Sequence, residues 1–122
     1  MNVNRVKIEN FGGTITTNAS GNATATSYLK VNGRIEAIRV ELGTATSADV
    51  QVNPTGLTDT NSLILNVTGV SSTTTYYPRI QVHKADGTQV STYTEFIVNG
   101  HLTLTVSNAG ANKTLKVTIY YV

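Results

Sequence analysis

The chain of 122 residues contains no cysteine and no tryptophan, only two prolines, and few charged side chains. Without cysteine its stability cannot depend on disulfides, so it must come from buried apolar side chains. A chain of this length buries roughly two-thirds of its unfolded surface, which is enough for one hydrophobic core. We therefore expect a single domain over residues 1–122, with residues 1–10 as an extended amino-terminal arm.

Charged residues make up only 13% of the chain, and the formal net charge is +2. The lysines and arginines are scattered and form no basic run, so the sequence does not point to a nucleic-acid partner. We expect no signal peptide, because the first residues lack an apolar segment, and no stretch is long enough to cross a membrane. The expected protein is soluble and is synthesised in the cytoplasm.

Residues suited to catalysis or metal binding are also scarce. The two histidines, His83 and His101, lie far apart in the sequence, and the seven acidic residues are isolated. No nucleophile elbow, phosphate-binding glycine loop or metal-ligand spacing occurs. A carboxylate pair of the glycosidase type would require the fold to bring two acidic residues together. We therefore expect a protein that is not an enzyme and that needs no cofactor or metal.

Threonine, serine and asparagine supply most of the polarity, and threonine is a β-branched residue that favours strands. The clearest pattern lies at the end of the chain, where apolar and polar residues alternate over Leu102–Ser107 and again over Leu115–Tyr121. The glycine-containing loop 109–112 separates the two stretches. This pattern predicts an antiparallel hairpin over His101–Val122 with one buried face. A hairpin alone is marginally stable, so other strands must cover that face.

Weaker alternation predicts further strands in the remainder of the chain. They are expected at Val6–Glu9, Thr14–Thr17, Ala23–Val31, Arg34–Leu42, Ala48–Val52, Leu63–Val67, Tyr76–Lys84 and Val90–Val98. Tight hairpin turns are expected at Asn32-Gly33, Ala85–Thr88 and Asn99-Gly100.

Two positions interrupt the alternation. A change of phase near Glu36-Ala37 predicts a β-bulge or a bend, and Pro78 predicts an edge strand or a bulged one. Residues 33–43 also have a helical spacing of apolar residues, but helix caps are absent and we favour a strand. With about eight to ten strands and no clear helix, the sequence predicts an all-β, two-sheet antiparallel β-sandwich of the jelly-roll or Greek-key type.

Adjacent tyrosines occur twice, at Tyr76-Tyr77 and at Tyr120-Tyr121. In a strand one tyrosine of each pair faces the core and the other faces outward. An outward tyrosine either forms the rim of the core or anchors a contact with a protein or a sugar. The candidate protein-contact residues are two of these tyrosines together with residues of the arm: Val3, Arg5, Val6, Ile8, Tyr77 and Tyr120.

Three segments resemble the small decoration proteins, also called cement proteins, on the heads of tailed bacteriophages. They are Gly33–Val52, Thr68–Thr88 and Leu102–Val122, which together cover more than half of the chain. The resemblance lies in style and arrangement and includes no catalytic motif and no binding motif that can be carried over residue by residue.

This resemblance implies a β-sandwich structural protein of the virion, located on the outer surface of the capsid. It would bridge copies of the major capsid protein as a homo-oligomer, a dimer or trimer, and so stabilise the mature head. Two alternatives stay open at this stage. One is a carbohydrate- or receptor-binding domain of a fibre or spike, and the other is a tail or connector component of the same virion.

Overall fold

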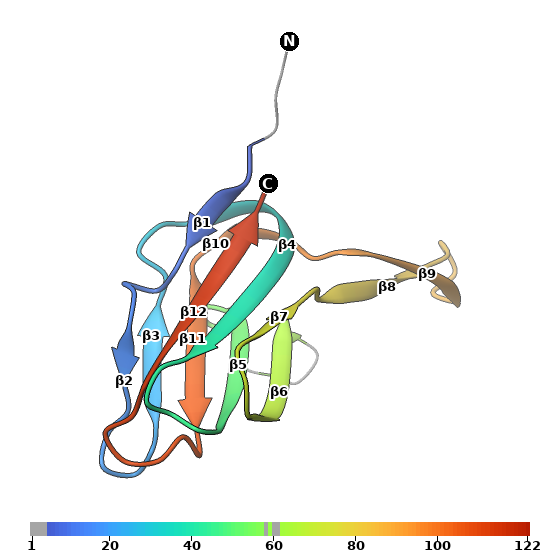
Figure 1. The fold of residues 1–122 in the computed structure, drawn as a ribbon. Helices are drawn as coiled ribbons and strands as arrows, with labels where there is room; N and C mark the ends of the chain where they lie inside the picture. The colour runs from blue at the N-terminus through green and yellow to red at the C-terminus, as the bar shows by residue number, and fades with distance from the viewer. Residues whose placement is uncertain (1–4, 58, 60–61) are drawn as a thin grey trace.

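The computed structural model describes residues 5–57, 59 and 62–122, which form antiparallel strands joined by turns and loops (Figure 1). In chain order the strands are β1 (Lys7–Glu9), β2 (Ile15–Thr16), β3 (Ala23–Thr26), β4 (Val31–Leu42), β5 (Ala48–Pro54), β6 (Leu65–Val70), β7 (Thr74–Tyr76), β8 (Arg79–His83), β9 (Gln89–Glu95), β10 (Ile97–Gly100), β11 (Leu102–Ser107) and β12 (Thr114–Tyr121). No α-helix occurs within these residues. The predicted all-β class is confirmed, and the helical alternative for residues 33–43 is wrong because β4 occupies most of them.

The strands form two larger sheets and one separate hairpin. Sheet A has the order β1-β12-β4-β10, with β2 also paired to β12 and β7 also paired to β4. Sheet B has the order β3-β11-β5-β6. Strands β8 and β9 pair with each other alone, and every pairing in the three sheets is antiparallel.

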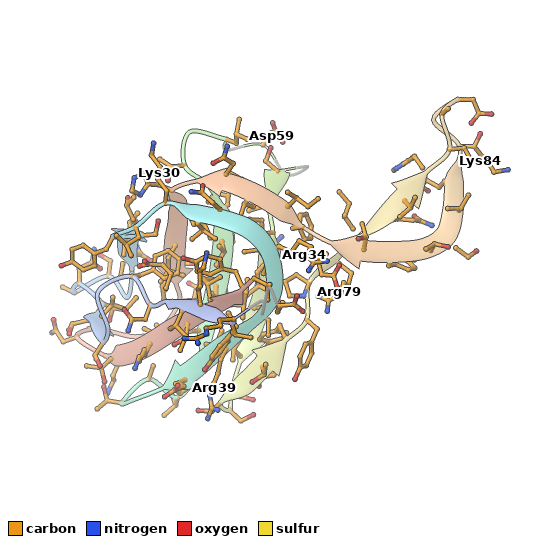
Figure 2. All side chains as sticks on the ribbon, turned by 90° about the horizontal axis from the view of Figure 1, so that it is seen from above. Lys30, Arg34, Arg39, Asp59, Arg79 and Lys84 are labelled. Atoms are coloured by element: carbon orange, nitrogen blue, oxygen red, sulfur yellow. The ribbon has the colours of Figure 1, made fainter. Side chains whose placement is uncertain are left out.

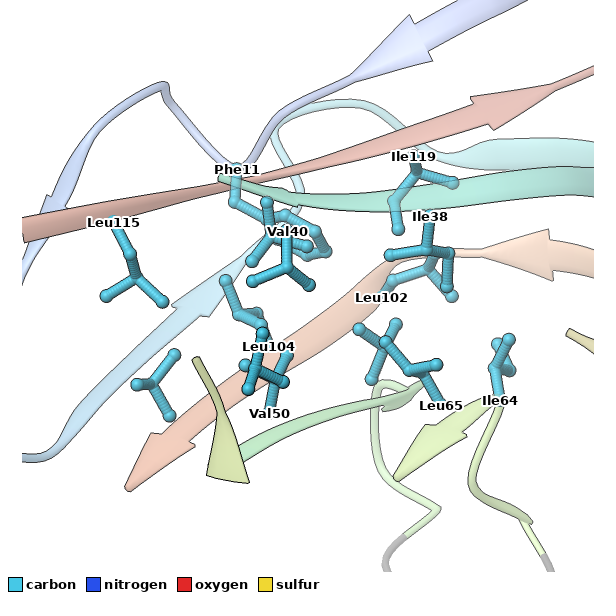
Figure 3. Packing of buried hydrophobic residues seen from close by; sticks show 14 of the residues in the cluster. Phe11, Ile38, Val40, Val50, Ile64, Leu65, Leu102, Leu104, Leu115 and Ile119 are labelled. Atoms are coloured by element: carbon cyan, nitrogen blue, oxygen red, sulfur yellow. The ribbon is translucent and has the colours of Figure 1, made fainter. Parts of the chain in front are cut away.

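One hydrophobic core lies between sheets A and B (Figure 3). The inward residues of each central strand alternate with outward polar residues, as the pleat of a strand requires. Burial of each large aliphatic side chain contributes about 1.5–3 kcal/mol to folding. The largest fully buried side chains come from both sheets: Val31, Ile35, Ile38, Val40, Leu115, Val117 and Ile119 from sheet A, and Val50, Val52, Leu102, Leu104 and Val106 from sheet B.

The predicted terminal hairpin is wrong, although both of its strands exist. Strand β11 pairs with β3 and β5 in sheet B, whereas β12 pairs with β1, β2 and β4 in sheet A. The connection 108–113 therefore crosses from one sheet to the other, with Asn108 and Asn112 at positive φ. Alternation establishes only that each strand has one buried face. In this fold the buried faces of β11 and β12 meet across the core.

Two of the three predicted hairpin turns are also wrong. Asn32-Gly33 lies inside β4 and Asn99-Gly100 lies inside β10, and the two asparagines are direct cross-strand partners. The turn at Ala85–Thr88 is confirmed, since it joins β8 to β9 and Lys84 N–H donates to the Thr88 carbonyl at 2.8 Å. The glycine of an Asn-Gly pair can adopt a positive φ. A strand that contains a residue of unusual φ needs this tolerance as much as a turn does, so the pair does not by itself identify a turn.

Strand β3 ends at Thr26, several residues earlier than predicted. The cause is Ser27, whose hydroxyl donates to the Leu29 carbonyl at 2.9 Å and accepts from the Leu102 N–H at 3.0 Å. The Ser27 N–H still donates to the Leu102 carbonyl at 2.9 Å, but the Ser27 hydroxyl replaces the Ser27 carbonyl as the acceptor of the second bond of this rung, and the chain turns away. Residues Tyr28–Lys30 consequently form a loop instead of the end of a strand.

The β-bulge predicted at Glu36-Ala37 is confirmed. Tyr120 pairs with Ala37 and Tyr121 pairs with Ile35, so Glu36 has no partner residue on β12. The Glu36 carbonyl instead accepts a hydrogen bond from Arg79 Nη1 at 3.2 Å. The extra residue at a bulge leaves backbone groups outside the ladder, and here an arginine satisfies one of them.

The predicted strand Tyr76–Lys84 is divided at Tyr77-Pro78 into β7 and β8. Proline has no N–H for the ladder, so pairing with β4 ends before it. Strands β8 and β9 then project from the body as a hairpin (Figure 1). We call residues 79–95 the arm, which is a different segment from the amino-terminal residues 1–10. None of its side chains is buried, so the arm adds little to the core.

Candidate protein-contact surface

The predicted contact residues of the amino-terminal segment lie at one edge of sheet A. Strand β1 occupies the end of the strand order, next to β12. Arg5, Val6 and Ile8 are all exposed, and Ile8 retains 59% of its accessible surface. Residues 7–9 of the amino-terminal segment, which was expected to be extended, are therefore a strand of the protein's own sheet. Val3 lies outside the described residues.

The structure brings three of the predicted residues into one row on the outer face of sheet A. Ile8 of β1 and Tyr120 of β12 are direct cross-strand partners, and Ala37 of β4 lies on the other side of Tyr120. Tyr77 follows Tyr76, whose partner on β4 is Ile38, so Tyr77 lies at the level of Ala37. Direct neighbours of this kind have Cβ atoms about 4.5–5.5 Å apart. We call Ile8, Tyr120, Ala37 and Tyr77 the outer row.

Both tyrosine pairs divide between the core and the surface as predicted. Tyr121 is buried and Tyr76 packs against the core, whereas Tyr77 is 66% exposed and Tyr120 is half-buried. Tyr120 lies beside Ile8, which accounts for its partial cover. The row presents aromatic and aliphatic surface together, which is the composition of the central part of many protein interfaces.

Charges are sparse on the remainder of this face. Arg39 and Glu41, which alternate with buried residues of β4, form an ion pair with an N–O distance of 3.4 Å. Their side chains are about half exposed, so the pair adds little to stability. Lys116 of β12, the cross-strand partner of Glu41, also lies on this face, so the outer row is flanked by two cations and one carboxylate.

A buried carboxylate near the row was not anticipated from the sequence. Glu9 is buried, and its Oε1 accepts from the N–H groups of Phe11 at 3.0 Å and Tyr28 at 3.1 Å. Its Oε2 accepts from the N–H of Leu29 at 3.3 Å. A buried charge requires such partners, because its desolvation would otherwise cost several kcal/mol. Glu9 therefore fixes the loop Tyr28–Lys30 against the end of β1.

The position of this loop corrects a second expectation. The sequence predicted a strand over Ala23–Val31, in which Leu29 alternates in phase with Val31, but Leu29 and Tyr28 are both exposed, Tyr28 by 78%. Because the strand ends at Thr26, the inward phase does not continue to Leu29. Residues Arg5–Ile8 and Tyr28–Lys30 together form a surface that we call the β1 rim.

A second group of exposed apolar side chains surrounds the base of the arm. Tyr77, Ile80, Tyr93 and Ile97 all lie within or beside the arm, and Ile97 is 77% exposed. Ile97 also lines an open cavity of about 360 Å³, together with Leu57, Asn99 and His101. Apart from Tyr77, the sequence provided no signal for this group, because its residues alternate as if one side were covered.

The two histidines have different surroundings, and Nδ1 of His101 lies 3.4 Å from the hydroxyl oxygen of Ser27. His83 is exposed on β8, whereas the Nδ1 of His101 lies 3.0 Å from the Ser27 carbonyl. Residues 5–57, 59 and 62–122 contain no group of three or more metal-ligating side chains. The same residues contain no helix that is long and apolar enough to span a membrane.

Hydrogen bonds lower the pKa of half-buried Asp49 and of exposed Asp86. The side chain of Asn108 and the N–H of Gly69 lower the pKa of Asp49. The N–H of Thr88 lowers the pKa of Asp86 in the turn of the arm. A catalytic general acid requires a shift in the opposite direction. Both carboxylates therefore act as acceptors that hold loops in place.

No protein-family model matches the sequence, and no curated protein matches it.

Proposed function

We propose that this protein is a structural protein of a bacteriophage virion that binds the outer surface of the capsid. It bridges copies of the major capsid protein and stabilises the mature head. The observation that carries the proposal is the outer row, in which exposed Ile8 is the cross-strand partner of Tyr120 and exposed Tyr77 follows the end of β7 on the far side of β4. The resemblance of three segments to phage decoration proteins indicates the kind of partner.

The strand order supports a β-sandwich of the jelly-roll type. Eight principal strands remain when β2, β7 and the arm are set aside, four in each sheet. Numbered one to eight along the chain, they have the order 1-8-3-6 in sheet A and 2-7-4-5 in sheet B. This is the order of a jelly roll, an architecture used by viral capsid proteins and by lectins.

The proposed mechanism is a passive clamp without catalysis, cofactor or metal. A protein that binds the assembled lattice more tightly than its dissociated subunits stabilises the lattice by mass action. A homo-oligomer, dimer or trimer, contacts two or more capsid subunits at once, which raises avidity by about 10²–10⁴-fold over a single contact. Synthesis in the host cytoplasm places the protein where capsids assemble.

The test is a binding assay of the purified protein with empty, expanded capsids of the source phage, followed by imaging. Regular density over the shell and greater resistance of the capsid to heat are expected. The double variant Tyr77→Ser/Tyr120→Ser should lose at least tenfold in affinity, because truncation of an interface tyrosine commonly costs more than 1 kcal/mol.

Leu57→Ser is the matched control, since Leu57 is exposed but lies outside the outer row. Its affinity for capsids should stay within about twofold of the wild type. An unmodified protein that leaves the shell bare would refute the proposal. Density confined to the vertex or tail would favour a tail or connector component instead.

A second candidate function is binding of a carbohydrate or receptor, favoured by the exposed tyrosines Tyr77, at the base of the arm, and Tyr93, within it. Aromatic rings of this kind stack on sugars, and lectins share the jelly-roll architecture. A glycan array tests it. Binding at millimolar concentration or better that is lost on Tyr77→Ser would establish this function in place of the capsid role.

A further inference from the structure

The β1 rim combines exposed apolar residues with positive charge. Arg5, Lys7 and Lys30 are all exposed. Glu9 is the one carboxylate between residues 5 and 30, and it is buried with its two oxygens occupied by three N–H groups. Its charge is therefore turned away from solvent, and the surface presented by the rim is basic.

Four exposed apolar side chains lie among these cations. Val6 and Ile8 share one side of β1, and Tyr28 and Leu29 extend from the loop that Glu9 holds. The positions of the loop residues are set by hydrogen bonds to a buried group, so little conformational entropy is lost when a partner binds. This surface is prepared for a ligand with both apolar and acidic groups.

The edge of β1 is open to an additional strand. In the described part of the chain β1 pairs on one side, with β12, and it is the last strand of sheet A in that direction. Lys7, which alternates with Val6 and Ile8, lies on the opposite side of β1, with its Nζ 5.9 Å from the ring centre of Tyr121. An extended segment beside β1 would meet apolar residues on one side and a cation on the other.

We propose that the β1 rim binds an extended acidic segment of a partner protein, with alternating acidic and apolar residues. The inference rests on the proposed function, because on the virion this segment would belong to the major capsid protein. The partner's main chain pairs with β1, its apolar residues cover Ile8, and its carboxylates approach Lys7 and Lys30. Pairing to a sheet edge provides affinity, and alternate side chains provide specificity.

Charge and geometry favour an acidic polypeptide over a second copy of the chain, a membrane or a nucleic acid as the ligand of the β1 rim. A second copy of the chain would bring a rim of the same sign, which opposes close approach. Membranes and nucleic acids attract cations, but three lysine and arginine residues form a small basic footprint, and neither ligand pairs with the main chain of a strand edge. An acidic polypeptide satisfies the charges, the apolar side chains and the open edge together.

The test uses the full chain and two fluorescein-labelled peptides in a fluorescence polarisation assay. One peptide alternates glutamate with valine and tyrosine, and the other has lysine in place of each glutamate. The acidic peptide should bind at least tenfold more tightly than the basic one, and its affinity should fall as salt is raised from about 0.05 M to about 0.5 M. Equal binding of the two peptides would overturn the inference.

Variants locate the binding surface. Lys7→Glu/Lys30→Glu should weaken binding of the acidic peptide at least tenfold. Lys84→Glu/Lys113→Glu makes the same change in net charge at exposed positions on other elements, and it should change the affinity less than twofold. Far-ultraviolet circular dichroism verifies that both variants are folded. An unchanged affinity in the rim variant would refute the assignment.

Two further measurements separate this inference from the proposed function. Phosphatidylglycerol vesicles or a single-stranded oligonucleotide that bind more tightly than the acidic peptide would overturn the choice of a protein partner. Capsid binding without peptide binding would refute the acidic segment and leave the capsid role intact. Peptide binding without capsid binding would refute the capsid role and leave the acidic-segment site intact.

Discussion

Gly33 lies directly against the backbone of Val122, so closely that a Cβ atom at position 33 would collide with the Val122 carbonyl oxygen. Two hydrogen bonds of 2.9 Å between the backbones of Arg34 and Val122 maintain this approach. Gly33 also has a φ of 141°, a conformation that L side chains rarely adopt. Glycine is therefore required here for close packing of two backbones within sheet A.

Replacing this glycine should destabilise the protein. We expect Gly33→Ala to lower the free energy of unfolding by about 1–3 kcal/mol, measured by guanidinium denaturation, because both the φ and the contact must change. Gly56→Ala is the control, since Gly56 also has a positive φ but has open space around its Cβ position. A loss for Gly33→Ala no greater than that for Gly56→Ala would show that the contact with Val122 has no effect.

Glu9→Gln tests the buried carboxylate. The neutral amide offers one acceptor oxygen in place of two, so the variant should lose about 1–3 kcal/mol of stability. Hydrogen exchange at the Tyr28 and Leu29 amides should accelerate, because these donate to Glu9. Glu41→Gln, which disrupts only an exposed ion pair with Arg39, should cost less than about 1 kcal/mol. Equal effects of the two changes would contradict the role of Glu9.

Leu104→Ala tests the core between the sheets. Leu104 is fully buried and lies among residues of both sheets (Figure 3). The cavity left by truncation should lower the free energy of unfolding by about 2–5 kcal/mol, measured by urea or thermal denaturation. Thr105→Ala, on the opposite face of β11, should cost less than about 1 kcal/mol. A loss of unfolding free energy below about 1 kcal/mol for Leu104→Ala would indicate that the two sheets do not pack against each other.

The pH dependence of stability should reflect Asp49. Its pKa is lowered in the folded protein, chiefly by the Asn108 side chain and then by the Gly69 N–H, so the charged form is favoured by folding. The stabilisation is complete above the ordinary aspartate pKa of about 3.9 and is lost as pH falls through the lower folded value. Asp49→Asn should therefore have a lower Tm than the wild type at neutral pH, and the difference should shrink below about pH 4. A difference that is constant with pH would contradict this assignment.

Removal of the arm should leave the body folded. Arg79 and Glu95 are cross-strand partners at its base, so a short Gly-Ser link can replace the residues between Pro78 and Phe96 (Figure 2 shows Arg79 at the base and Lys84 near the tip). Since the arm contains no buried side chain, we expect the unfolding free energy to change by less than about 2 kcal/mol. Loss of cooperative thermal unfolding would show that the arm stabilises the sheets.

Part of the candidate surface followed from the sequence alone. The tyrosine pairs divided as alternation predicted, because the two faces of a strand are set by a period of two. The proximity of Ile8 and Tyr120 did not follow from the sequence, because most of the chain separates them and they become neighbours only through pairing of β1 with β12. The role of Glu9 could not be anticipated, because its three donors lie on two different segments.

The sequence by itself determined which apolar residues of β11 and β12 are buried, because their burial follows local periodicity, whereas the burial of Thr118 on the outer face did not follow from it. It also determined the bulge at Glu36, where a one-residue change of phase has no other solution within a strand. Only the tertiary structure decided that β11 and β12 belong to different sheets and that Gly33 lies within a strand. The physical reason is that a strand shows the same alternation of apolar and polar residues whether the next strand in sequence lies beside it in the same sheet or across the core. Which strands pair therefore depends on contacts between residues distant in sequence.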